Sequence, residues 1–235
     1  MALRRVVTLD ALGTLVELER PAPRLVAELS ARGVRVDESQ AAAALRAEIA
    51  YYRAHHDGAS DAATLALLRD RCAEVLRGAL QDAGADLGAL AQAKLREALL
   101  ASLHFRAYDD VPAVLANLRA AGHRLVVVSN WDVSLHEMLR MTGLRSLVDG
   151  AISSAEAGAR KPSPEIFRHA LQLAGVVDAA QPALHVGDSL ELDVAGALGA
   201  GLRAVLVSRT GAPPPELPAG VPLLTTLDGL PALAA

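Results

Sequence analysis

Two acidic residues in this sequence follow short apolar runs, and together they could hold a metal ion. Asp10 ends the run Val6-Val7-Thr8-Leu9, and Asp188 follows the run Ala183–Val186 after one glycine. Short apolar runs with β-branched residues are typical of buried strands. Open α/β sheets bind ligands at the carboxyl ends of their strands, so we expect both carboxylates at that edge. Two such acids beside a cation are what a hard divalent metal requires.

The residues after Asp10 favour a sharp turn. Gly13 allows the backbone to bend and to approach a ligand closely, and the Thr14 hydroxyl can fix the turn by bonding to backbone groups. An ordinary strand end followed by a turn is the alternative interpretation of Asp10 and Thr14. A function for them therefore depends on partners elsewhere in the chain.

Two further loops supply a hydroxyl and a positive charge. Ser129-Asn130 follows the apolar run 124–128 and offers a hydroxyl and nearby backbone amides to an anion. Lys161 places a compact charge just before a helix start. Only two of the 23 lysine and arginine residues are lysine, so Lys161 departs from this chain's usual cation. A solvated surface cation is the alternative for Lys161, and a helix N-cap is the alternative for Asp188.

Strands and helices alternate around these four loops. The expected strands are residues 4–9, 124–128, 149–153, 183–186 and 203–207, and the expected helices are residues 111–121, 134–142, 163–175 and 190–200. This alternation predicts an α/β fold with a parallel sheet covered on both faces. His185, inside one of the expected strands, is expected to be a core residue whose polar groups are satisfied.

A long helical stretch separates the first expected strand from the second. Four helices are expected, with starts at Pro21, Asp37, Asp61 and Asp86. Helices without an intervening strand predict an all-helical domain inserted after the first strand. The expected boundaries are a core of residues 1–16 and 105–235 and an inserted domain of residues 17–104.

Composition narrows the class of protein. The chain has 235 residues, a net charge of −4 with acids and bases mixed, and one cysteine, Cys72. The charge gives no sign of a nucleic-acid footprint. One cysteine excludes an internal disulfide framework and fits a reducing, cytoplasmic compartment. No apolar run approaches the ~20 residues of a membrane span, and no signal peptide is recognisable. The expected partner is a small molecule, and no oligomeric state is predicted.

Read in order, the motifs resemble those of the haloacid dehalogenase-like (HAD) hydrolase superfamily. The matching residues are Asp10-x-x-Gly-Thr-Leu, Ser129-Asn130, Lys161-Pro162 and Gly187-Asp188-x-x-x-x-Asp193. Each motif alone is weakly specific, but all four in this order and spacing are a strong signal. The resemblance covers nearly the whole chain, because the helical insertion is similar to that superfamily's cap domain. It implies a Rossmann-like core, a helical cap and hydrolase activity with Mg²⁺ as cofactor.

The resemblance also implies roles for individual residues. Asp10 would be the nucleophile and would form an aspartyl intermediate. Mg²⁺ would be held by the Asp10 carboxylate, the Leu12 backbone carbonyl and Asp188, with Asp193 supporting the site.

The other motif residues would contact the substrate, which is expected to be a small phosphorylated molecule. Ser129 and Lys161 would hold the phosphoryl oxygens, and Thr14 and Asn130 would lie at the same binding site. Mg²⁺ and Lys161 would neutralise the charge that develops as phosphorus is attacked.

The sequence departs from the family pattern at Leu12. Phosphatases of the family usually carry a second acid two residues after the nucleophile, which protonates the leaving group and later activates water. Leu12 occupies that position and cannot transfer a proton. General acid–base catalysis typically contributes about 10²–10⁴-fold. We therefore expect weak turnover of alkyl phosphates and better retained activity on acyl or aryl phosphates.

The missing acid brings two other functions into consideration. The family's 2-haloacid dehalogenases attack carbon and use no metal, but they lack the acid that Asp188 supplies and place a Tyr where Phe167 stands. They also need a cap arginine for the substrate carboxylate, for which Arg46 and Arg53 are candidates. A non-catalytic module that binds a phosphorylated ligand or a protein partner would retain Asp10 only as a metal ligand. The metal-dependent phosphohydrolase is favoured over both.

Overall fold

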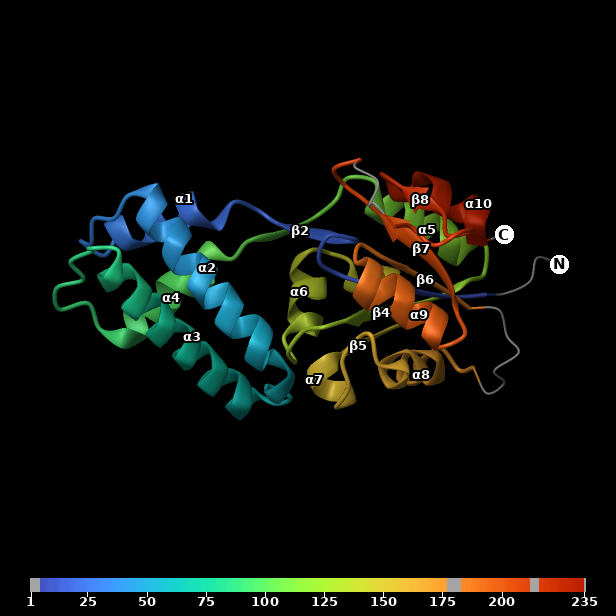
Figure 1. The fold of residues 1–235 in the computed structure, drawn as a ribbon, viewed down its shortest axis with the longest axis horizontal. Helices are drawn as coiled ribbons and strands as arrows, with labels where there is room; N and C mark the ends of the chain where they lie inside the picture. The colour runs from blue at the N-terminus through green and yellow to red at the C-terminus, as the bar shows by residue number, and fades with distance from the viewer. Residues whose placement is uncertain (1–4, 177–182, 212–215, 235) are drawn as a thin grey trace. The chain divides into compact units, whose positions relative to one another are not determined.

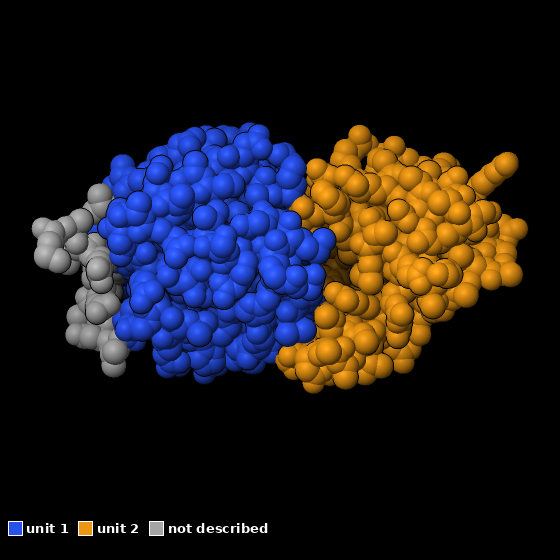
Figure 2. Space-filling model, turned by 180° about the vertical axis from the view of Figure 1, so that it is seen from behind, with its two compact units in different colours: residues 1–17, 106–235 blue, residues 18–105 orange. Residues whose placement is uncertain are grey.

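The structure is a computed structural model that describes residues 5–176, 183–211 and 216–234. The chain forms two compact units, coloured separately in Figure 2. Unit 1 is Met1–Glu17 with Arg106–Ala235, and unit 2 is Leu18–Phe105. The start of the first expected strand, Arg4, lies outside the described residues.

Unit 1 is built on a six-stranded parallel sheet (Figure 1). Its strands, in spatial order, are β5 (Gly150–Ser153), β4 (Arg124–Ser129), β1 (Val6–Leu9), β6 (Ala183–Gly187), β7 (Arg203–Val207) and β8 (Leu223–Leu224). The chain fills one side of β1 first and then crosses to β6 on the other side. Such a reversal of strand order is where open α/β sheets bind ligands. The predicted α/β fold with a parallel sheet is confirmed.

Helices cover this sheet because its central strands are apolar on both faces. The α-helices of unit 1 are α5 (Val111–Ala120), α6 (Leu135–Met141), α7 (Ser154–Ala157), α8 (Pro164–Leu173), α9 (Gly196–Gly199) and α10 (Leu230–Ala234). On one face, Ile166 and Phe167 of α8 belong to the same buried cluster as Val126 and Val128 of β4. Every residue of β1 is buried, as expected for a strand with helices on both sides.

The segment before α9 differs from the continuous helix predicted over residues 190–200. Leu190–Ala195 forms a π-helical turn, in which the Val194 N–H bonds to the carbonyl of Ser189, five residues back, at 3.1 Å. Such turns interrupt regular helices at functional sites more often than elsewhere. This one carries Asp193 on its inner, buried side.

Unit 2 contains four α-helices: α1 (Pro21–Ser30), α2 (Glu38–His55), α3 (Ala62–Asp82) and α4 (Gln92–Ser102). The chain enters it along β2 (Val16–Leu18) and leaves it along β3 (Phe105–Ala107), and these two strands pair with each other. The predicted all-helical stretch therefore has a short strand at either end. Its core is made of leucines and alanines with Val34 and Cys72. None of the helices in the described ranges has the length and apolar character needed to cross a membrane.

Two of the predicted helix caps in unit 2 are confirmed and one is wrong. Asp37 and Asp61 each accept a 2.8 Å hydrogen bond from the backbone N–H of the third residue of the following helix. Asp86 caps no helix, because its carboxylate accepts the Gly88 N–H at 2.9 Å within a local turn. The next helix begins only at Gln92.

Candidate active site

The turn after Asp10 forms the centre of the candidate site, at the carboxyl end of β1. The Asp10 N–H bonds to the Val186 carbonyl of β6 at 2.9 Å, and the Leu15 N–H bonds to the Ala11 carbonyl at 2.8 Å. Gly13 has a φ of 82°, a conformation that glycine adopts without steric cost. The sharp turn expected at Gly13 is therefore present.

Thr14 does not fix this turn through its side chain. Its hydroxyl is buried and, among the described residues, has no hydrogen-bond partner. The Thr14 carbonyl instead accepts a 2.5 Å hydrogen bond from Arg209, whose guanidinium also pairs with both carboxylate oxygens of Asp110. The expected bonds from the Thr14 hydroxyl to backbone groups are therefore wrong, and a contact of Thr14 with substrate stays a prediction.

Asp10, Asp188 and Asp193 each bring a ligand oxygen to within 4.8 Å of the others. Two glycines make this approach possible. A Cβ on Gly13 would lie 2.3 Å from Asp188 Oδ2, and a Cβ on Gly187 would lie 2.1 Å from the Asp193 carboxyl carbon. The fold thus brings the two expected metal ligands, Asp10 and Asp188, together with the expected supporting residue.

Lys161 lies inside this cluster and not at the surface. Its side chain is 2% exposed, and its Nζ donates to Asp10 Oδ1 at 2.6 Å and to Asp193 Oδ1 at 2.5 Å. Asn130 Nδ2 donates to the Lys161 carbonyl at 3.1 Å, and Asn130 Oδ1 accepts the Lys161 N–H at 2.8 Å. The solvated-cation alternative for Lys161 is wrong. The Asn130 side chain holds the lysine backbone, and its contact with substrate stays a prediction.

Only one oxygen of the Asp10 carboxylate accepts hydrogen bonds from the described residues. Ser129 Oγ and Lys161 Nζ both donate to Oδ1, at 3.0 and 2.6 Å. Within the described ranges no donor contacts Oδ2. The expected nucleophile is therefore oriented through one oxygen, while the other is available to a substrate or a metal ion.

Ser189, and not Asp188, caps the helical turn that follows β6. The Ser189 hydroxyl accepts the Leu192 N–H at 3.1 Å, and the Ser189 N–H donates to Asp193 Oδ2 at 2.9 Å. The N-cap alternative for Asp188 is therefore wrong, and its carboxylate is free of that structural task.

His185 connects the cluster to the core of the sheet. Its ring is fully buried, with Nε2 3.0 Å from Asp193 Oδ1 and Nδ1 2.9 Å from Thr8 Oγ1. The expectation of a satisfied core residue holds, but the sequence reasoning missed that the partner is Asp193. The sequence carries a signal for Thr8 only. Thr8 precedes Asp10 by two residues, and alternate residues of a strand share one face, so Thr8 is expected on the same face as Asp10.

The charges of the cluster shift the pKa values of its members. Burial acts to lower the pKa of Lys161, but Asp10 and Asp193 outweigh burial and raise it, so the ammonium persists. Burial acts to raise the pKa of Asp193, but Lys161 and His185 hold it well below its usual value. Burial raises the pKa of Asp10, which the neighbouring ammonium only partly offsets. Burial lowers the pKa of His185, which favours a neutral ring.

Asp188 shows that the cluster carries more negative charge than it balances. Although Asp188 is exposed as a residue, desolvation of its carboxyl group and the charges of Asp10 and Asp193 raise its pKa to about 7. Three carboxylates face the single ammonium of Lys161, so full ionisation leaves two negative charges in excess. A divalent cation would compensate them, and carboxylate oxygens are the ligands that Mg²⁺ prefers. The donor set therefore fits Mg²⁺.

The remaining residues singled out in the sequence lie outside the hydrogen-bonded cluster. Leu12, in the same turn as the nucleophile, has 37% of its surface exposed; its carbonyl as a metal ligand stays a prediction. Phe167 is fully buried in α8, with its ring 4.9 Å from that of His185. Arg46 and Arg53 are exposed residues of α2.

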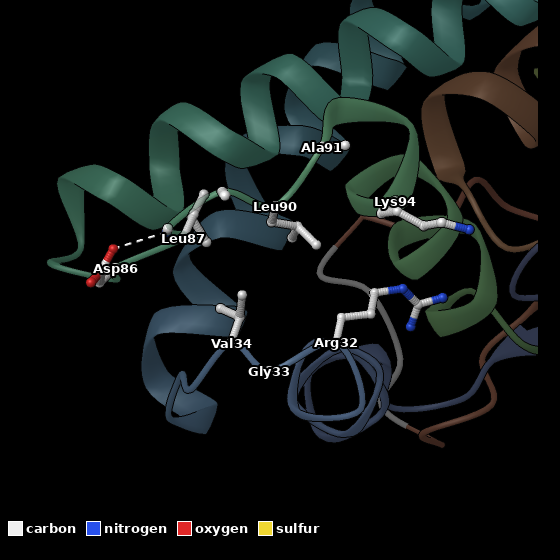
Figure 3. Close-up of a pocket in the computed structure, with 10 residues that line it drawn as sticks. Arg32, Gly33, Val34, Asp86, Leu87, Leu90, Ala91 and Lys94 are labelled. Atoms are coloured by element: carbon white, nitrogen blue, oxygen red, sulfur yellow. Dashed lines mark hydrogen bonds between the residues drawn. The ribbon is translucent and has the colours of Figure 1, made fainter.

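A separate cavity of about 530 Å³ lies within unit 2 (Figure 3). Its charged lining residues are Arg32, Asp86 and Lys94, and none of the expected site residues lines it. Arg32 pairs with Glu28 at 2.6 Å, and Lys94 pairs with Glu97 at 2.8 Å. Because both cations of the cavity already have partners, the chemistry is assigned to the Asp10 cluster.

Gly187→Ala is expected to displace Asp193 and to lower the free energy of unfolding by about 1–3 kcal/mol. The added methyl group would overlap the Asp193 carboxyl group, which is buried and hydrogen-bonded on both oxygens. Gly199→Ala is a matched control, because a Cβ there meets nothing within 4 Å, and its effect should stay within about 1 kcal/mol. Chemical denaturation measures both. Equal effects would contradict the tight approach at Gly187.

Comparison with known proteins points to one family. Residues 4–201 match the family model described as haloacid dehalogenase-like hydrolase. Haloacid dehalogenase-like hydrolase domain-containing protein 3 of Mus musculus is 32% identical over 209 residues, 87% of this chain and 82% of that protein. The Bos taurus counterpart matches over only 39% of its own length. The plasmid phosphoglycolate phosphatase of Cupriavidus necator is 41% identical over 130 residues, 54% of this chain and 54% of that protein.

Solved structures share the fold over nearly the whole chain. A HAD phosphatase from Thermococcus onnurineus is 25% identical, with a TM-score of 0.65 over 97% of this chain and 97% of that chain. A 2-haloacid dehalogenase from Pseudomonas syringae pv. Tomato is also 25% identical, with a TM-score of 0.66 over 98% of each. Because the two are equally similar, the fold does not decide between their reactions.

Proposed function

The chain belongs to the haloacid dehalogenase-like hydrolase family, and on that premise we propose that it is a Mg²⁺-dependent phosphohydrolase acting through an aspartyl-phosphate at Asp10. The observation that carries the proposal is the charge of the Asp10, Asp188 and Asp193 cluster, which the single ammonium of Lys161 leaves uncompensated. Relatives named as phosphatases, such as the phosphoglycolate phosphatase, support phosphorus as the centre attacked.

In the proposed reaction Asp10 Oδ2, the oxygen without a donor, attacks phosphorus. The Oδ2–phosphorus bond forms as the bond to the leaving-group oxygen breaks, and the leaving group departs with the electron pair. Water then attacks phosphorus, the Oδ2–phosphorus bond breaks with its electron pair returning to the carboxylate, and inorganic phosphate leaves while the proton lost by water passes to solvent. Ser129 and Lys161 orient Asp10 through Oδ1 and would bind phosphoryl oxygens, with Thr14 and Asn130 at the same binding site.

The metal belongs to the same proposal. Asp10, the Leu12 carbonyl and Asp188 would hold Mg²⁺, and Asp193 would support them. When bound, Mg²⁺ would supply neutralisation of the charge on the phosphoryl group.

Leu12 limits the substrates that this site would turn over well. An aliphatic side chain cannot protonate a leaving group, so an alkoxide would have to depart unassisted. Carboxylate and phenolate leaving groups need little or no proton. The proposed substrates are therefore small acyl or aryl phosphates, with alkyl phosphates turned over slowly.

Hydrolysis of acetyl phosphate with and without Mg²⁺ tests the proposed function. We expect phosphate release that requires Mg²⁺, with no halide released from 2-chloropropionate in the same buffer. Halide release without metal would replace the proposal by a dehalogenase. Binding of Mg²⁺ without turnover of any phosphate in a panel of acyl, aryl and alkyl esters would replace it by a non-catalytic binding module.

One observation favours the dehalogenase as a second candidate, namely the equal similarity to the solved 2-haloacid dehalogenase. Two observations in the structure weigh against it. Phe167 is buried against His185 and offers no hydroxyl to a substrate. Asp188 adds a carboxylate beside Asp10, and an additional negative charge there would repel a substrate carboxylate.

Asp188→Asn is expected to weaken Mg²⁺ binding by about tenfold or more, because one of the two charged ligands is lost. Calorimetric titration of Mg²⁺ without substrate measures this directly. Asp109→Asn is the matched control, because Asp109 has 92% of its side chain exposed and lies outside the three-carboxylate cluster. Unchanged affinity in the Asp188 variant would remove that residue from the proposed ligand set.

Leu12→Asp is expected to raise kcat/KM for alkyl phosphates by about 10²–10⁴-fold, the usual contribution of a general acid. Leu12 is partly exposed, so water can solvate the new carboxyl group without a large loss of stability. Acetyl phosphate hydrolysis should change far less. Leu12→Asn introduces a side chain of the same size as aspartate but without an acidic proton, so its kcat/KM for alkyl phosphates should not rise. Equal rates for the two variants would show that Leu12 does not stand in the place of the acid.

The proposal extends to the cellular setting. A cytoplasmic location rests on the single cysteine of the sequence, and the net charge of −4 argues against a nucleic-acid partner. The proposed partner is a small phosphorylated substrate, and no membrane association is proposed.

A further inference from the structure

We propose that Thr8 and His185 are positioning residues that keep the Lys161 ammonium on Asp10, an inference that rests on the proposed function. Both act through Asp193. The contacts run from Thr8 Oγ1 to His185 Nδ1 (2.9 Å), from His185 Nε2 to Asp193 Oδ1 (3.0 Å), from that oxygen to Lys161 Nζ (2.5 Å), and from Nζ to Asp10 Oδ1 (2.6 Å). One continuous line of hydrogen bonds therefore joins the sheet to the nucleophile.

The backbone fixes the start of this line. β1 and β6 are paired so that Thr8 lies opposite His185, and opposite residues of parallel strands point to the same face. Asp10 follows Thr8 by two residues and shares that face. Thr8 and His185 are fully buried, so no water competes for their polar atoms. Their contact is thus set by strand register, which is among the most rigid features of the fold.

The hydrogen-bond directions follow from the partners. Asp193 is an ionised acceptor, so His185 Nε2 must carry a proton to bond to it. In a neutral ring Nδ1 is then a bare acceptor, and a donor must face it. The Thr8 hydroxyl is that donor, because its contact with Nδ1 is 2.9 Å, whereas its alternative acceptor, the Leu184 carbonyl, is 3.4 Å away. Thr8 therefore sets the tautomer of His185.

The tautomer matters because Asp193 holds Lys161. Asp193 Oδ1 accepts from both Lys161 and His185, and Oδ2 accepts from the Ser189 N–H. With the other tautomer a bare Nε2 would face the carboxylate and repel it. Asp193 would then rotate away, and the ammonium would follow it, so that Asp10 would lose a donor on Oδ1. The expected effect is a lower rate of the chemical step with little change in substrate binding.

The test compares Thr8→Val, which has the same shape without the hydroxyl, with Thr8→Ser, which keeps it. For acetyl phosphate hydrolysis we expect kcat of Thr8→Val to fall about tenfold or more, as for other residues that orient active-site groups. KM should stay within about twofold, and Thr8→Ser should restore kcat. Val126→Ala controls for stability, because Val126 is buried on β4 directly opposite Thr8 and makes no part of the line; its kcat should be unchanged. Equal kcat in Thr8→Val and the unaltered protein would overturn the inference.

Nitrogen-15 NMR of the His185 ring gives a readout that does not depend on activity. The unaltered protein should show a proton on Nε2 and none on Nδ1, and Thr8→Val should lose this pattern. A proton on Nδ1 in the unaltered protein, or the same spectrum in both proteins, would overturn the inference. If no phosphate is hydrolysed by the unaltered protein, the proposed function fails, and the NMR comparison alone decides whether Thr8 sets the tautomer.

Discussion

Asp10→Asn should abolish Mg²⁺-dependent hydrolysis of acetyl phosphate, with a loss of about 10⁴-fold or more, as when other covalent enzymes lose their nucleophile. The amide has nearly the shape of the carboxylate, and its oxygen can still accept from Ser129 and Lys161 at the position of Oδ1. It has no charge with which to attack phosphorus. The measurement is phosphate release, together with acid trapping of the phosphorylated protein from ³²P-labelled acetyl phosphate.

The fold should survive this substitution. Burial raises the pKa of Asp10 even though Lys161 is adjacent, which means that the ionised group is held in the folded state at a cost. Removing it should leave the unfolding midpoint unchanged or higher, as at other sites where activity is kept at the expense of stability.

Asp132→Asn is the matched control for Asp10→Asn. Asp132 is another buried carboxylate near the end of β4, where it accepts the Ser134 N–H at 2.6 Å. It lies outside the three-carboxylate cluster, so its variant should keep hydrolysing acetyl phosphate. Hydrolysis by Asp10→Asn within tenfold of the unaltered protein, or labelled protein after acid trapping, would assign the attack to another group.

That the site residues lie close together was predictable from the positions of the strands in the sequence. Apolar runs locate β1, β4 and β6, and parallel strands end at one edge of a sheet. Asp10 and Asp188 follow β1 and β6, and Ser129 is the last residue of β4, so their proximity follows from the order of elements. Lys161 stands out for another reason, because it is a lysine in a chain whose cations are almost all arginine. Its burial in the cluster accounts for a lysine at this position. The compact ammonium donates to one oxygen of each of two carboxylates, Asp10 and Asp193, whereas a guanidinium is a larger, planar group.

What the pattern did not predict depends on side-chain geometry. Whether Asn130 points toward a ligand or toward the Lys161 backbone is a matter of one rotamer, and residue type alone does not decide it. Thr14 shows the same limit, because Arg209, almost two hundred residues away, takes the role that local turn chemistry assigned to the Thr14 hydroxyl. Asp86 failed as a cap because a glycine two residues later closes a turn first.

The π-helical turn explains why the role of Asp193 was only partly visible. Helical periodicity predicts a regular helix over residues 190–200. In such a helix Asp193 would be one of the acidic residues that are common in the first turn. In the structure the chain forms a π-helical turn over Leu190–Ala195, and the Asp193 carboxylate lies where a Cβ of Gly187 would be. Asp193 accepts hydrogen bonds from Lys161 and His185 in this conformation, and these contacts favour the π-helical turn over a regular helix. Such tertiary contacts leave no periodic signal in the sequence.

Lys161→Met should produce the largest combined loss of activity and stability. It removes the only cation that pairs with Asp10 and Asp193 within the described cluster. Breaking a buried ion pair from one side typically lowers the free energy of unfolding by about 3–5 kcal/mol, because an uncompensated charge stays behind. The loss of a donor at the reacting centre should lower kcat for acetyl phosphate by about 10²–10³-fold. Lys94→Met is the matched control, because the chain's other lysine is 59% exposed and pairs with Glu97 on the surface of α4; its effect should stay below about 1 kcal/mol.

The stability loss of Lys161→Met should depend on pH, with a sign that distinguishes electrostatics from packing. Already in the unaltered protein the pKa of Asp188 is raised from 3.8 to about 7 and the pKa of Asp10 is raised. Removing the ammonium raises the pKa values of Asp188 and Asp10 further. Above pH 3.8, the usual pKa of an aspartate, and up to these raised values, the folded variant therefore binds more protons than the unfolded chain, and its stability falls as pH rises. Urea denaturation in EDTA at pH 5 and pH 8 measures the difference. We expect the deficit relative to the unaltered protein to be larger at pH 8. A deficit that is equal at both values would mean that Lys161 stabilises the fold by packing, and that its charge is not what holds the three carboxylates together.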